Sequence, residues 1–577
     1  MKRGYSTSFL LILILLLAAG LRFSRTDWDE SRHLHPDERF LSMVVNDISW
    51  PKWTSYFDTE HSPLNPSNND KTFFVYGTFP IFLTKFAGDL TGFNGYEGYT
   101  QVGRALSAFF DIMTVFVLFL FAKRVFNSKA ALLSSLLLSI TVLHIQHSHF
   151  FVVDLFATFF IVLAFYFLIL FTETGKKVHA ILLGISWGFA LSSKLSTLYF
   201  GVMVVLACVL LMARKTQSVQ SKRAQILKTS FVLLLSVLLI CLSAFLVFRI
   251  FQPYAFDGPA IWNVNLEERF VADFQRLSYF HSRGSIFVPV LQWSNRSPFF
   301  QAVNLTLWGF GIPLSIVCWL GILLGVYLLL IKKDKKFLLP LAWVLFVLVF
   351  QAITFVKYLR YMLPGTPFMV FFGGIFLAKL IEGAKSNQVW RKIIAVFLIL
   401  GCVLWAFAFA NIYFQRVSRI QASIWIYDNI PSNSTVSNEH WDDSLPFQVN
   451  ERQSPGQFLK FENLGVFEGD TDKKIETLSE QLSRTDYIFL TSNRAYKVIP
   501  RLPDKYPFTS NYYMLLFNGD LGFSLEKTFT NYPNIFGIEI IDDDAEESFT
   551  VYDHPKVLIF KKEKQMSSED ILRLLKK

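Results

Sequence analysis

The segment Phe9–Leu21 reads FLLILILLLAAGL, and the acidic tetrad His35-Pro36-Asp37-Glu38 follows a short distance later. An apolar run of this kind after the basic pair Lys2-Arg3 predicts a helix inserted in a membrane. Acidic residues at the edge of a membrane domain indicate a functional site by default, because ionised groups there are energetically unfavourable. The tetrad is therefore the first candidate site, and the remaining sequence indicates what kind of site it is.

The composition places the chain among membrane proteins that cross the bilayer several times. Of its 577 residues, 52% are hydrophobic and 17% are charged, and 62 are phenylalanine. A soluble protein rarely has so apolar a composition. The cysteines predict no disulfide framework, because all of them lie in hydrophobic runs: Cys208, Cys241, Cys318 and Cys402.

The positive charge is unevenly distributed. The formal net charge is +10, but residues 416–577 contain 19 Lys and Arg against 25 Asp and Glu. The preceding part holds the remaining 36 basic residues against 20 acidic ones. Most of this basic excess lies in short loops between hydrophobic runs, where it determines membrane topology. The distribution argues against nucleic acid as a partner.

Eleven hydrophobic segments are candidate spans, and most of them approach the roughly 20 residues that a membrane-spanning helix needs. The first is predicted to be an uncleaved anchor rather than a signal peptide, since no small-x-small cleavage site precedes its end. The fifth and sixth are short and close together, so a single bent helix or a re-entrant pair is an alternative there. The predicted spans are Ser8–Phe23, Arg104–Ala122, Ala130–His147, Val152–Phe171, His179–Ser192, Ser196–Ala213, Thr229–Phe248, Leu305–Ile331, Phe337–Phe355, Pro364–Ile381 and Arg391–Tyr413.

Alternate loops between these segments are basic and are therefore predicted to be cytoplasmic, together with the N-terminus. The long segments Ser24–Gly103, Arg249–Asn304 and Phe414–Lys577 then face outward. We expect an integral protein of the cytoplasmic membrane with a transmembrane domain over 1–413 and an extracytoplasmic soluble domain over 414–577. The bilayer itself is thus a predicted partner.

The C-terminal segment has the pattern of a small α/β domain. Three short β-branched or aromatic runs predict strands, and two amphipathic runs predict helices. Strands separated by helical stretches are typical of an α/β fold. The predicted strands are Ser434–Ser437, Asp486–Leu490 and Lys556–Phe560, and the predicted helices are Lys473–Leu482 and Ser568–Leu575.

The outward-facing loops gather acidic and basic residues that suit one kind of chemistry. A carboxylate such as Asp37 can act as general base toward an acceptor hydroxyl. Lysine and arginine at the membrane edge, such as Lys194 and Arg360, can neutralise a phosphate leaving group. Together they fit group transfer from a lipid-linked phosphate donor on the outer face of the membrane.

Several motifs resemble integral-membrane glycosyltransferases of the GT-C fold. The resemblance is to glycosyltransferase family 39, the protein O-mannosyltransferase and aminoarabinose-transferase-like group. The matching motifs run in order through most of the membrane domain. They are His35-Pro36-Asp37-Glu38, Tyr76-Gly77-Thr78-Phe79-Pro80, Gly103-Arg104, the segment around His149 and Asp154, Gly188–Lys194 and Arg360-Tyr361-Met362-Leu363-Pro364.

The resemblance implies an inverting transfer of a sugar from a polyprenyl-phosphate donor. It maps the catalytic acid/base residue onto Asp37, with Glu38 as a second catalytic candidate. It implies phosphate binding by Lys194 and Arg360. The further candidate substrate-binding residues are Tyr361, Asp154, His149, Arg104 and Tyr76.

Simpler structural roles compete with these assignments. Pro36, Asp37 and Glu38 also suit the first turn of a helix, and Asp154 could cap the helix that it begins. Lys194 and Arg360 could be ordinary interface anchors. Five histidines in the outer segments raise the question of a divalent metal, but their spacing is no recognised ligand signature. The sequence identifies no cofactor, and a divalent metal is an alternative that is not favoured.

The predicted function is therefore sugar transfer from a polyprenyl-phosphate-linked donor to a glycan, lipid or protein acceptor. A transporter or flippase for a lipid-linked substrate is a second hypothesis. It is less favoured, because transporters usually place ionisable residues near the bilayer midplane and often show paired repeats. A membrane-anchored protein whose C-terminal domain binds glycan or peptide is the third.

Overall fold

The computed structural model describes residues 2–217, 223–382, 388–449 and 451–577. These residues form two compact units. The first contains the segments up to Asp27, Ser31–Ser278 and Pro298–Ala410. The second contains Trp28–Glu30, Tyr279–Ser297 and Asn411–Lys577.

The first unit is helical, and a helix or a bent helix pair lies at each of the eleven predicted spans. Eight helices among the described residues are long and apolar enough to cross a membrane, or nine if the bent pair counts as one span. Two more, α8 and α16, have 17 residues each. The prediction of a polytopic helical membrane protein is confirmed, with eleven as an approximate number. The helices are α1 (Lys2–Phe23), α4 (Gly95–Val125), α5 (Ser128–Ser139) with α6 (Val142–Ser148), α7 (Asp154–Thr174), α8 (Lys177–Ser193), α9 (Gly201–Gln217), α10 (Arg223–Phe251), α14 (Ile312–Leu330), α15 (Leu338–Ile353), α16 (Thr366–Glu382) and α17 (Val389–Ala410).

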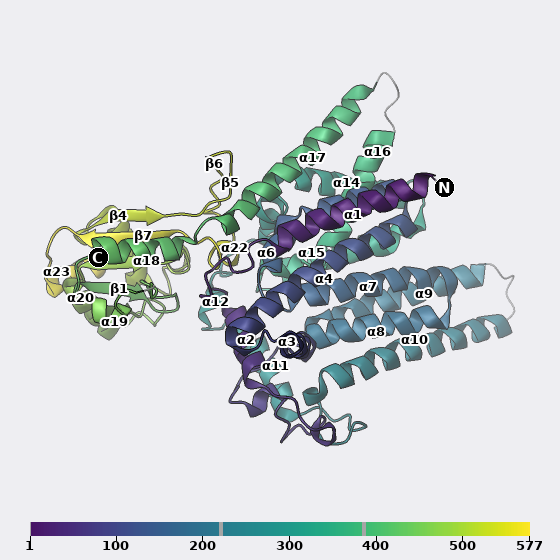
Figure 1. Cartoon of the computed structure of the whole chain (residues 1–577), viewed down its shortest axis with the longest axis horizontal. Helices are drawn as coiled ribbons and strands as arrows, with labels where there is room; N and C mark the ends of the chain where they lie inside the picture. The colour runs from purple at the N-terminus through teal and green to yellow at the C-terminus, as the bar shows by residue number, and fades with distance from the viewer. Residues whose placement is uncertain (1, 218–222, 383–387, 450) are drawn as a thin grey trace. The chain divides into compact units, whose positions relative to one another are not determined.

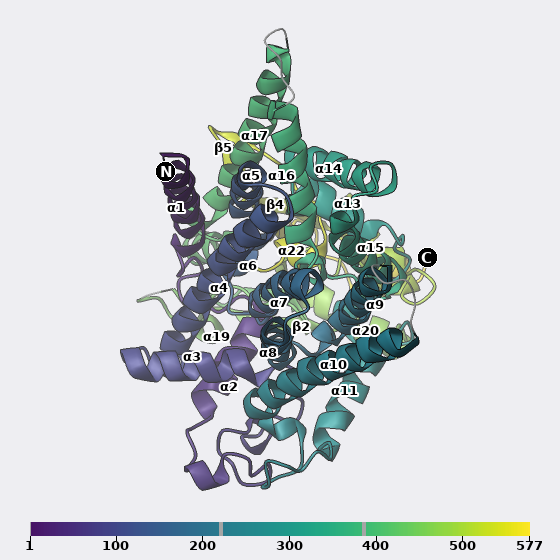
Figure 2. The ribbon, with the colours of Figure 1, turned by 90° about the vertical axis from the view of Figure 1, so that its right-hand side faces the viewer.

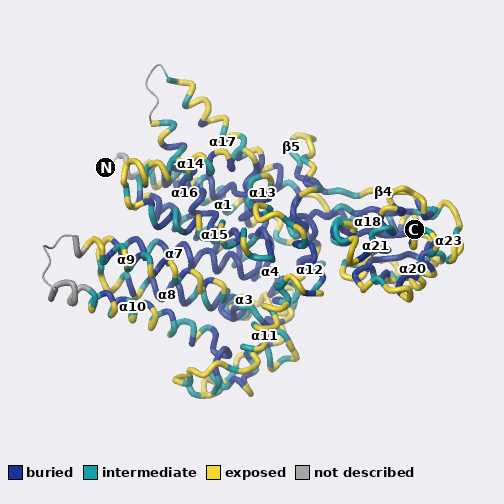
Figure 3. The backbone as a smooth tube through the Cα atoms, turned by 180° about the vertical axis from the view of Figure 1, so that it is seen from behind, coloured by how far each residue is buried: buried dark blue, intermediate teal, exposed yellow. Residues whose placement is uncertain are grey.

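These helices pack side by side in a continuous series (Figure 1). Helix α8 lies between α7 and α10, α4 packs against α5 and α7, and α16 packs against α5 and α14 (Figure 2). Large apolar side chains on α10 remain exposed at helical spacing, at Phe231, Leu234, Leu238, Leu242 and Leu246. Figure 3 shows exposed positions recurring along the backbone of α10. An exposed apolar row along a helix of this length is typical of a lipid-facing surface.

The predicted spans differ from the structure in their bounds, and one of them also in its continuity. The third was expected to be continuous over Ala130–His147, but it bends by 55° between α5 and α6. Arg22 satisfies carbonyl groups at this break, because its guanidinium donates to Ser139 O at 2.7 Å and to Leu138 O at 3.2 Å. The eighth helix begins at Ile312 rather than Leu305, and the eleventh ends at Ala410 rather than Tyr413.

Shorter helices build the loops at one end of the first unit. The segment after α1 forms α2 (Pro36–Asp47) and α3 (Thr78–Thr91), and the segment after α10 leads into α11 (Glu268–Phe280). The two segments share one hydrophobic cluster that contains Leu41, Phe74 and Tyr254. Burial of these side chains holds α2 in a fixed position at the ends of the long helices. A helix of five residues, α13 (Phe300–Asn304), precedes α14.

The second unit contains a mixed five-stranded sheet of order β2-β1-β3-β7-β4. Strand β1 is parallel to β2 and β3, whereas β7 is antiparallel to β3 and β4. A two-stranded hairpin, β5 (Asn534–Ile535) and β6 (Ile538–Glu539), stands apart from this sheet. The sheet strands are β1 (Thr435–Glu439), β2 (Lys460–Leu464), β3 (Tyr487–Leu490), β4 (Phe523–Phe529) and β7 (Val557–Lys562).

Helices cover both faces of this sheet. Successive side chains of a strand point to opposite faces, so neighbouring residues of one strand belong to different hydrophobic clusters. Ile488 and Phe560 join the cluster of α20, α21 and α23, whereas Phe489 and Ile559 join that of α18. The α/β prediction is confirmed, including its three strands and two helices. The helices of this unit are α12 (Val288–Leu291), α18 (Ser418–Asn429), α19 (Pro455–Phe458), α20 (Asp472–Arg484), α21 (Pro507–Asn518), α22 (Glu547–Thr550) and α23 (Ser568–Leu575).

Candidate active site

The tetrad begins helix α2, so the expected helix start is confirmed. Pro36 occupies the first helical position, where its missing N–H needs no partner. The Nδ1 atom of His35 accepts a hydrogen bond from the backbone N–H of Glu38 at 3.4 Å. This cap fixes the first turn, and the helical rotation between consecutive residues sends Asp37 and Glu38 to different surroundings.

Glu38 is fully buried, and both of its carboxylate oxygens accept hydrogen bonds. The guanidinium of Arg104 donates to Oε2 at 2.9 Å and to Oε1 at 2.5 Å. The backbone N–H of Phe151 donates to Oε2 at 2.7 Å. Glu38 thus fastens α2 to α4 and to the segment that precedes α7.

Asp37 is in a more open position. Its carboxylate is 23% exposed and forms an ion pair with the guanidinium of Arg360, which is 17% exposed. Burial alone would raise the pKa of Asp37, but the charges of Arg360 and His35, with hydrogen bonds from Arg360 and Tyr76, lower it to about 2. Asp37 is therefore ionised at neutral pH and remains accessible.

A second carboxylate and a second cation lie beside this pair. Lys194 Nζ donates to Asp154 Oδ1 at 2.6 Å and lies 4.5 Å from the centre of the Tyr361 ring. The guanidinium carbon of Arg360 lies 5.9 Å from the same ring. Burial raises the pKa of Tyr361 to about 12, so its hydroxyl is neutral. One tyrosine therefore contacts both cations, each of which is paired with one carboxylate.

Helix ends bring these residues together. Asp154 is the first residue of α7, Lys194 follows the last residue of α8, and Arg360 lies between α15 and α16. Gly77 packs directly on the end of α8: a Cβ atom there would lie 2.1 Å from the carbonyl oxygen of Ser192. Only glycine permits this approach, which holds neighbouring Tyr76 beside Asp37.

Two other predicted site residues have structural contacts. Arg104 is bound to Glu38, and it also donates to Thr26 O at 2.6 Å. His149 is fully buried, with its ring nitrogens 2.8 Å and 2.9 Å from the carbonyl oxygens of Ile145 and Ser24. Both residues hold the segment that carries the site.

Two residues near the site were not among the predicted binding residues. The ring of Tyr358 lies 4.9 Å from the guanidinium carbon of Arg360. His147 is close enough to interact electrostatically with Asp154 and Arg360, and its buried Nδ1 has no hydrogen-bond partner. Their positions in the same short segments as His149 and Arg360 are the sequence signal that could have indicated them.

Across the described ranges, no group of three or more His, Cys, Asp or Glu is arranged to hold a metal ion.

Comparison with known proteins supports the proposed resemblance. Residues 89–255 match the family model described as dolichyl-phosphate-mannose-protein mannosyltransferase. No curated protein matches the chain.

Solved structures match the fold over most of the chain. The Archaeoglobus fulgidus oligosaccharyltransferase in the apo form has a TM-score of 0.52 at 12% identity, over 89% of this chain and 73% of that one. The oligosaccharyltransferase AglB from Archaeoglobus fulgidus, in complex with an inhibitory peptide and a dolichol-phosphate, has a TM-score of 0.52 at 14% identity, over 88% and 72%. ArnT from Cupriavidus metallidurans bound to undecaprenyl phosphate has a TM-score of 0.43 at 14% identity, over 70% and 71%. The chain therefore has the GT-C fold and resembles the membrane glycosyltransferases of family 39.

Proposed function

We propose that this protein transfers a sugar from a polyprenyl-phosphate-linked donor to an acceptor hydroxyl, with inversion at the anomeric carbon. Asp37 is the general base, and Lys194 and Arg360 bind the phosphate of the donor. The reaction takes place at the extracytoplasmic face, the N-terminus is cytoplasmic, and residues 414–577 form an extracytoplasmic domain. The acceptor is a glycan, a lipid or a protein.

The main support for this proposal is a group of two cations and two carboxylates beside one tyrosine. The cations are Arg360 and Lys194, their carboxylate partners are Asp37 and Asp154, and the tyrosine is Tyr361. Two accessible cations at one place suit a phosphate, because each can exchange its carboxylate partner for a phosphate oxygen. Lys194 is 26% exposed and Arg360 17%, so both can be reached. A lone interface anchor would need no such set of partners.

In an inverting displacement the base and the leaving group stand on opposite sides of the anomeric carbon. The ion pair between Asp37 and Arg360 must therefore open to admit the sugar. Once Arg360 binds the donor phosphate, burial dominates the pKa of Asp37 and raises it. Donor binding thus makes Asp37 a stronger base when the acceptor hydroxyl must lose its proton.

The bond changes balance without a co-reactant. The acceptor oxygen forms a bond to the anomeric carbon as its proton passes to a carboxylate oxygen of Asp37. The bond between the anomeric carbon and the phosphate oxygen breaks, and the electron pair stays on the phosphate. Lys194 and Arg360 stabilise the additional negative charge. Glu38, Arg104 and His149 position the first turn of α2 and the segment before α7, and Tyr76 orients the carboxylate of Asp37.

The test is the activity of purified Asp37→Asn in detergent or nanodiscs, with a panel of undecaprenyl-phosphate-linked sugars as donors. Release of undecaprenyl phosphate is expected to fall by at least about 100-fold, which is typical for loss of a general base. Asp47→Asn is the matched control, since Asp47 lies at the other end of α2 and pairs with Lys71. Wild-type activity of Asp37→Asn with an intact fold would disprove the role of Asp37.

A further inference from the structure

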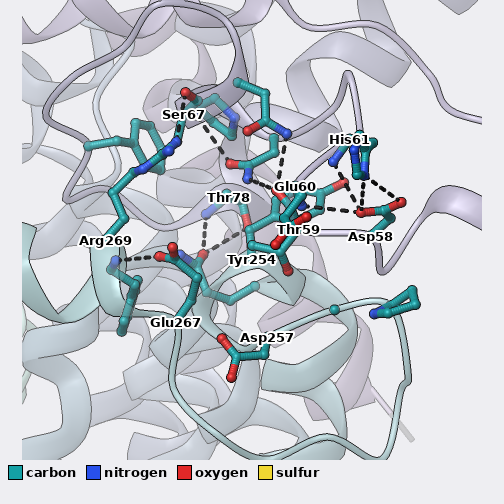
Figure 4. A pocket seen from close by; sticks show the side chains of 18 of the residues that line it. Asp58, Thr59, Glu60, His61, Ser67, Thr78, Tyr254, Asp257, Glu267 and Arg269 are labelled. Carbon is teal, nitrogen blue, oxygen red and sulfur yellow. Dashed lines mark hydrogen bonds and ion pairs between the residues drawn. The ribbon is translucent and has the colours of Figure 1, made fainter.

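A cavity lies outside the group of residues around Asp37. It has a volume of about 560 Å³ and lies between residues 58–78 and residues 252–273 of the first unit (Figure 4). This volume is within the roughly 300–1,000 Å³ range of small-ligand sites. Neither Asp37 nor Arg360 is among its lining residues.

The lining of this cavity is strongly acidic. Five carboxylates face one guanidinium, that of Arg269. Asp58 interacts with His61 at 3.2 Å, but no cationic side chain of the described chain forms an ion pair with Asp257, Asp273 or the two glutamates of the lining. In Figure 4 no dashed line joins the carboxylate of Asp257 to the other residues drawn. Like charges gathered in a cavity repel one another, so this site attracts a cation and disfavours a phosphate.

The deepest carboxylate lies beside aromatic rings. Asp273 is 6% exposed, and one of its oxygens accepts the backbone N–H of Phe74 at 2.9 Å. Phe74 and Tyr254 are both buried and line the cavity, as does Phe270. Burial of an ionised carboxylate is unfavourable unless a charge or hydrogen bonds compensate for it. Aromatic faces and a buried carboxylate together favour an organic cation on an apolar stem.

We propose that this cavity binds a lysine or arginine side chain of a peptide acceptor. The aliphatic stem packs against Phe74 and Tyr254, and the charged head reaches Asp273. An amine attached directly to a sugar ring lacks such a stem, so an amino sugar fits less well. A divalent metal also fits poorly, because no suitably arranged ligand group occurs among the described residues.

The cavity is connected to the proposed active site by one short segment. Phe74 and Thr78 line the cavity, whereas Tyr76 lies between them in sequence and contacts Asp37. The rings of Phe74 and Tyr76 are 6.2 Å apart. A basic residue held in the cavity would therefore place the adjoining acceptor hydroxyl toward Asp37. This assignment rests on the proposed transferase function and specifies its acceptor.

The experiment measures binding rather than transfer, with full-length protein in nanodiscs. Two fluorescent probes are compared by polarisation: a peptide of alternating lysine and serine, and the same peptide with glutamine for lysine. The lysine peptide is expected to bind at least about tenfold more tightly and to lose affinity as salt rises. Asp273→Asn keeps a hydrogen-bond acceptor for the backbone N–H of Phe74. This variant is expected to bind the lysine peptide about tenfold more weakly than the wild type and to bind the glutamine peptide with unchanged affinity.

Controls separate this proposal from the transferase itself. Glu97→Gln, an exposed acid at the start of α4 outside the lining, should bind like the wild type. If Asp273→Asn does not fold, Asp257→Asn tests the same charge requirement. Asp37→Asn should retain peptide binding, so failure of the transferase assay would leave this result intact.

Three results would overturn the proposal: equal affinity for the two peptides, unchanged binding in both cavity variants, or tighter binding of a glucosamine tetramer than of the lysine peptide.

Discussion

Asp37 and Glu38 are adjacent in the chain but have opposite electrostatic environments. Glu38 is fully buried against Arg104, and both oxygens are engaged. Glu38→Gln would leave the buried guanidinium of Arg104 without a counter-charge, which costs about 3–5 kcal/mol. We expect a lower midpoint of chemical unfolding in detergent micelles. Asp37→Asn, by contrast, should abolish transfer with little effect on that midpoint.

The paired measurement separates a structural acid from a catalytic one. An unchanged unfolding midpoint for Glu38→Gln would contradict the structural role. Rescue is a further check: Glu38→Gln combined with Arg104→Met removes both charges together and should recover part of the lost stability.

Arg360 controls the ionisation of Asp37, and this predicts a change in pH dependence. The pKa of Asp37 in the donor-free protein is about 2, so protonation of Asp37 should not lower the kcat/KM of the wild type, which reports the free enzyme, between pH 7 and pH 4. In Arg360→Met the lowering charge is gone while burial remains, so the pKa of Asp37 rises. Residual kcat/KM should then fall with decreasing pH over a range where the wild type is flat. If kcat/KM depends on pH in the same way in the wild type and in Arg360→Met, Arg360 does not control the ionisation of Asp37.

At the scale of elements, the long helices could be predicted from sequence because lipid exposure requires long apolar segments. The break between α5 and α6 could not, since it depends on Arg22, which lies over a hundred residues earlier in the chain. Strands β2 and β4 were also missed. Their side chains are mostly exposed, so they lack the apolar alternation that marks a half-buried strand.

The site residues were predicted to share one face, because charge alternation assigns helix ends to sides of the membrane. Their pairing could not be predicted. Whether Arg360 binds Asp37 or Asp154 depends on the three-dimensional arrangement of α2, α7 and the segment before α16. The same holds for the carboxylates of the acidic cavity, which two segments far apart in the sequence bring together.

The segment before α3 contacts the end of α8 at Gly77, so we expect a larger residue at this position to lower transfer activity. In Gly77→Ala the new Cβ would lie 2.1 Å from Ser192 O and 2.4 Å from Ser193 O, both backbone atoms. The segment must therefore move away from α8 and take Tyr76 away from Asp37. We expect transfer activity to fall about tenfold or more, because misplacement of about 1 Å can have such an effect. Gly20→Ala on α1 is the matched control, since nothing lies within 4 Å of its Cβ. Equal activity in the two variants would contradict the proposed contact.

At the scale of the whole molecule, the second compact unit is built from separate segments of the chain. Val288 and Leu291 of α12 are buried in the same hydrophobic cluster as Leu478 and Ile488. The guanidinium of Arg501 also donates to Gln292 O at 3.1 Å. Residues 279–297 are therefore part of the core of the C-terminal α/β unit, although they precede it by more than a hundred residues.

This arrangement predicts that residues 411–577 alone form a destabilised domain. Loss of Val288 and Leu291 removes about 3–6 kcal/mol of apolar burial, a large part of the 5–15 kcal/mol typical of a domain. Fusing residues 279–297 to the N-terminus of the fragment through a flexible glycine-serine linker should raise the urea midpoint at an unchanged slope. The double substitution Val288→Ala and Leu291→Ala in the fusion should return the midpoint toward that of the bare fragment. If the bare fragment and the fusion unfold at the same urea concentration, the segment is not part of this core.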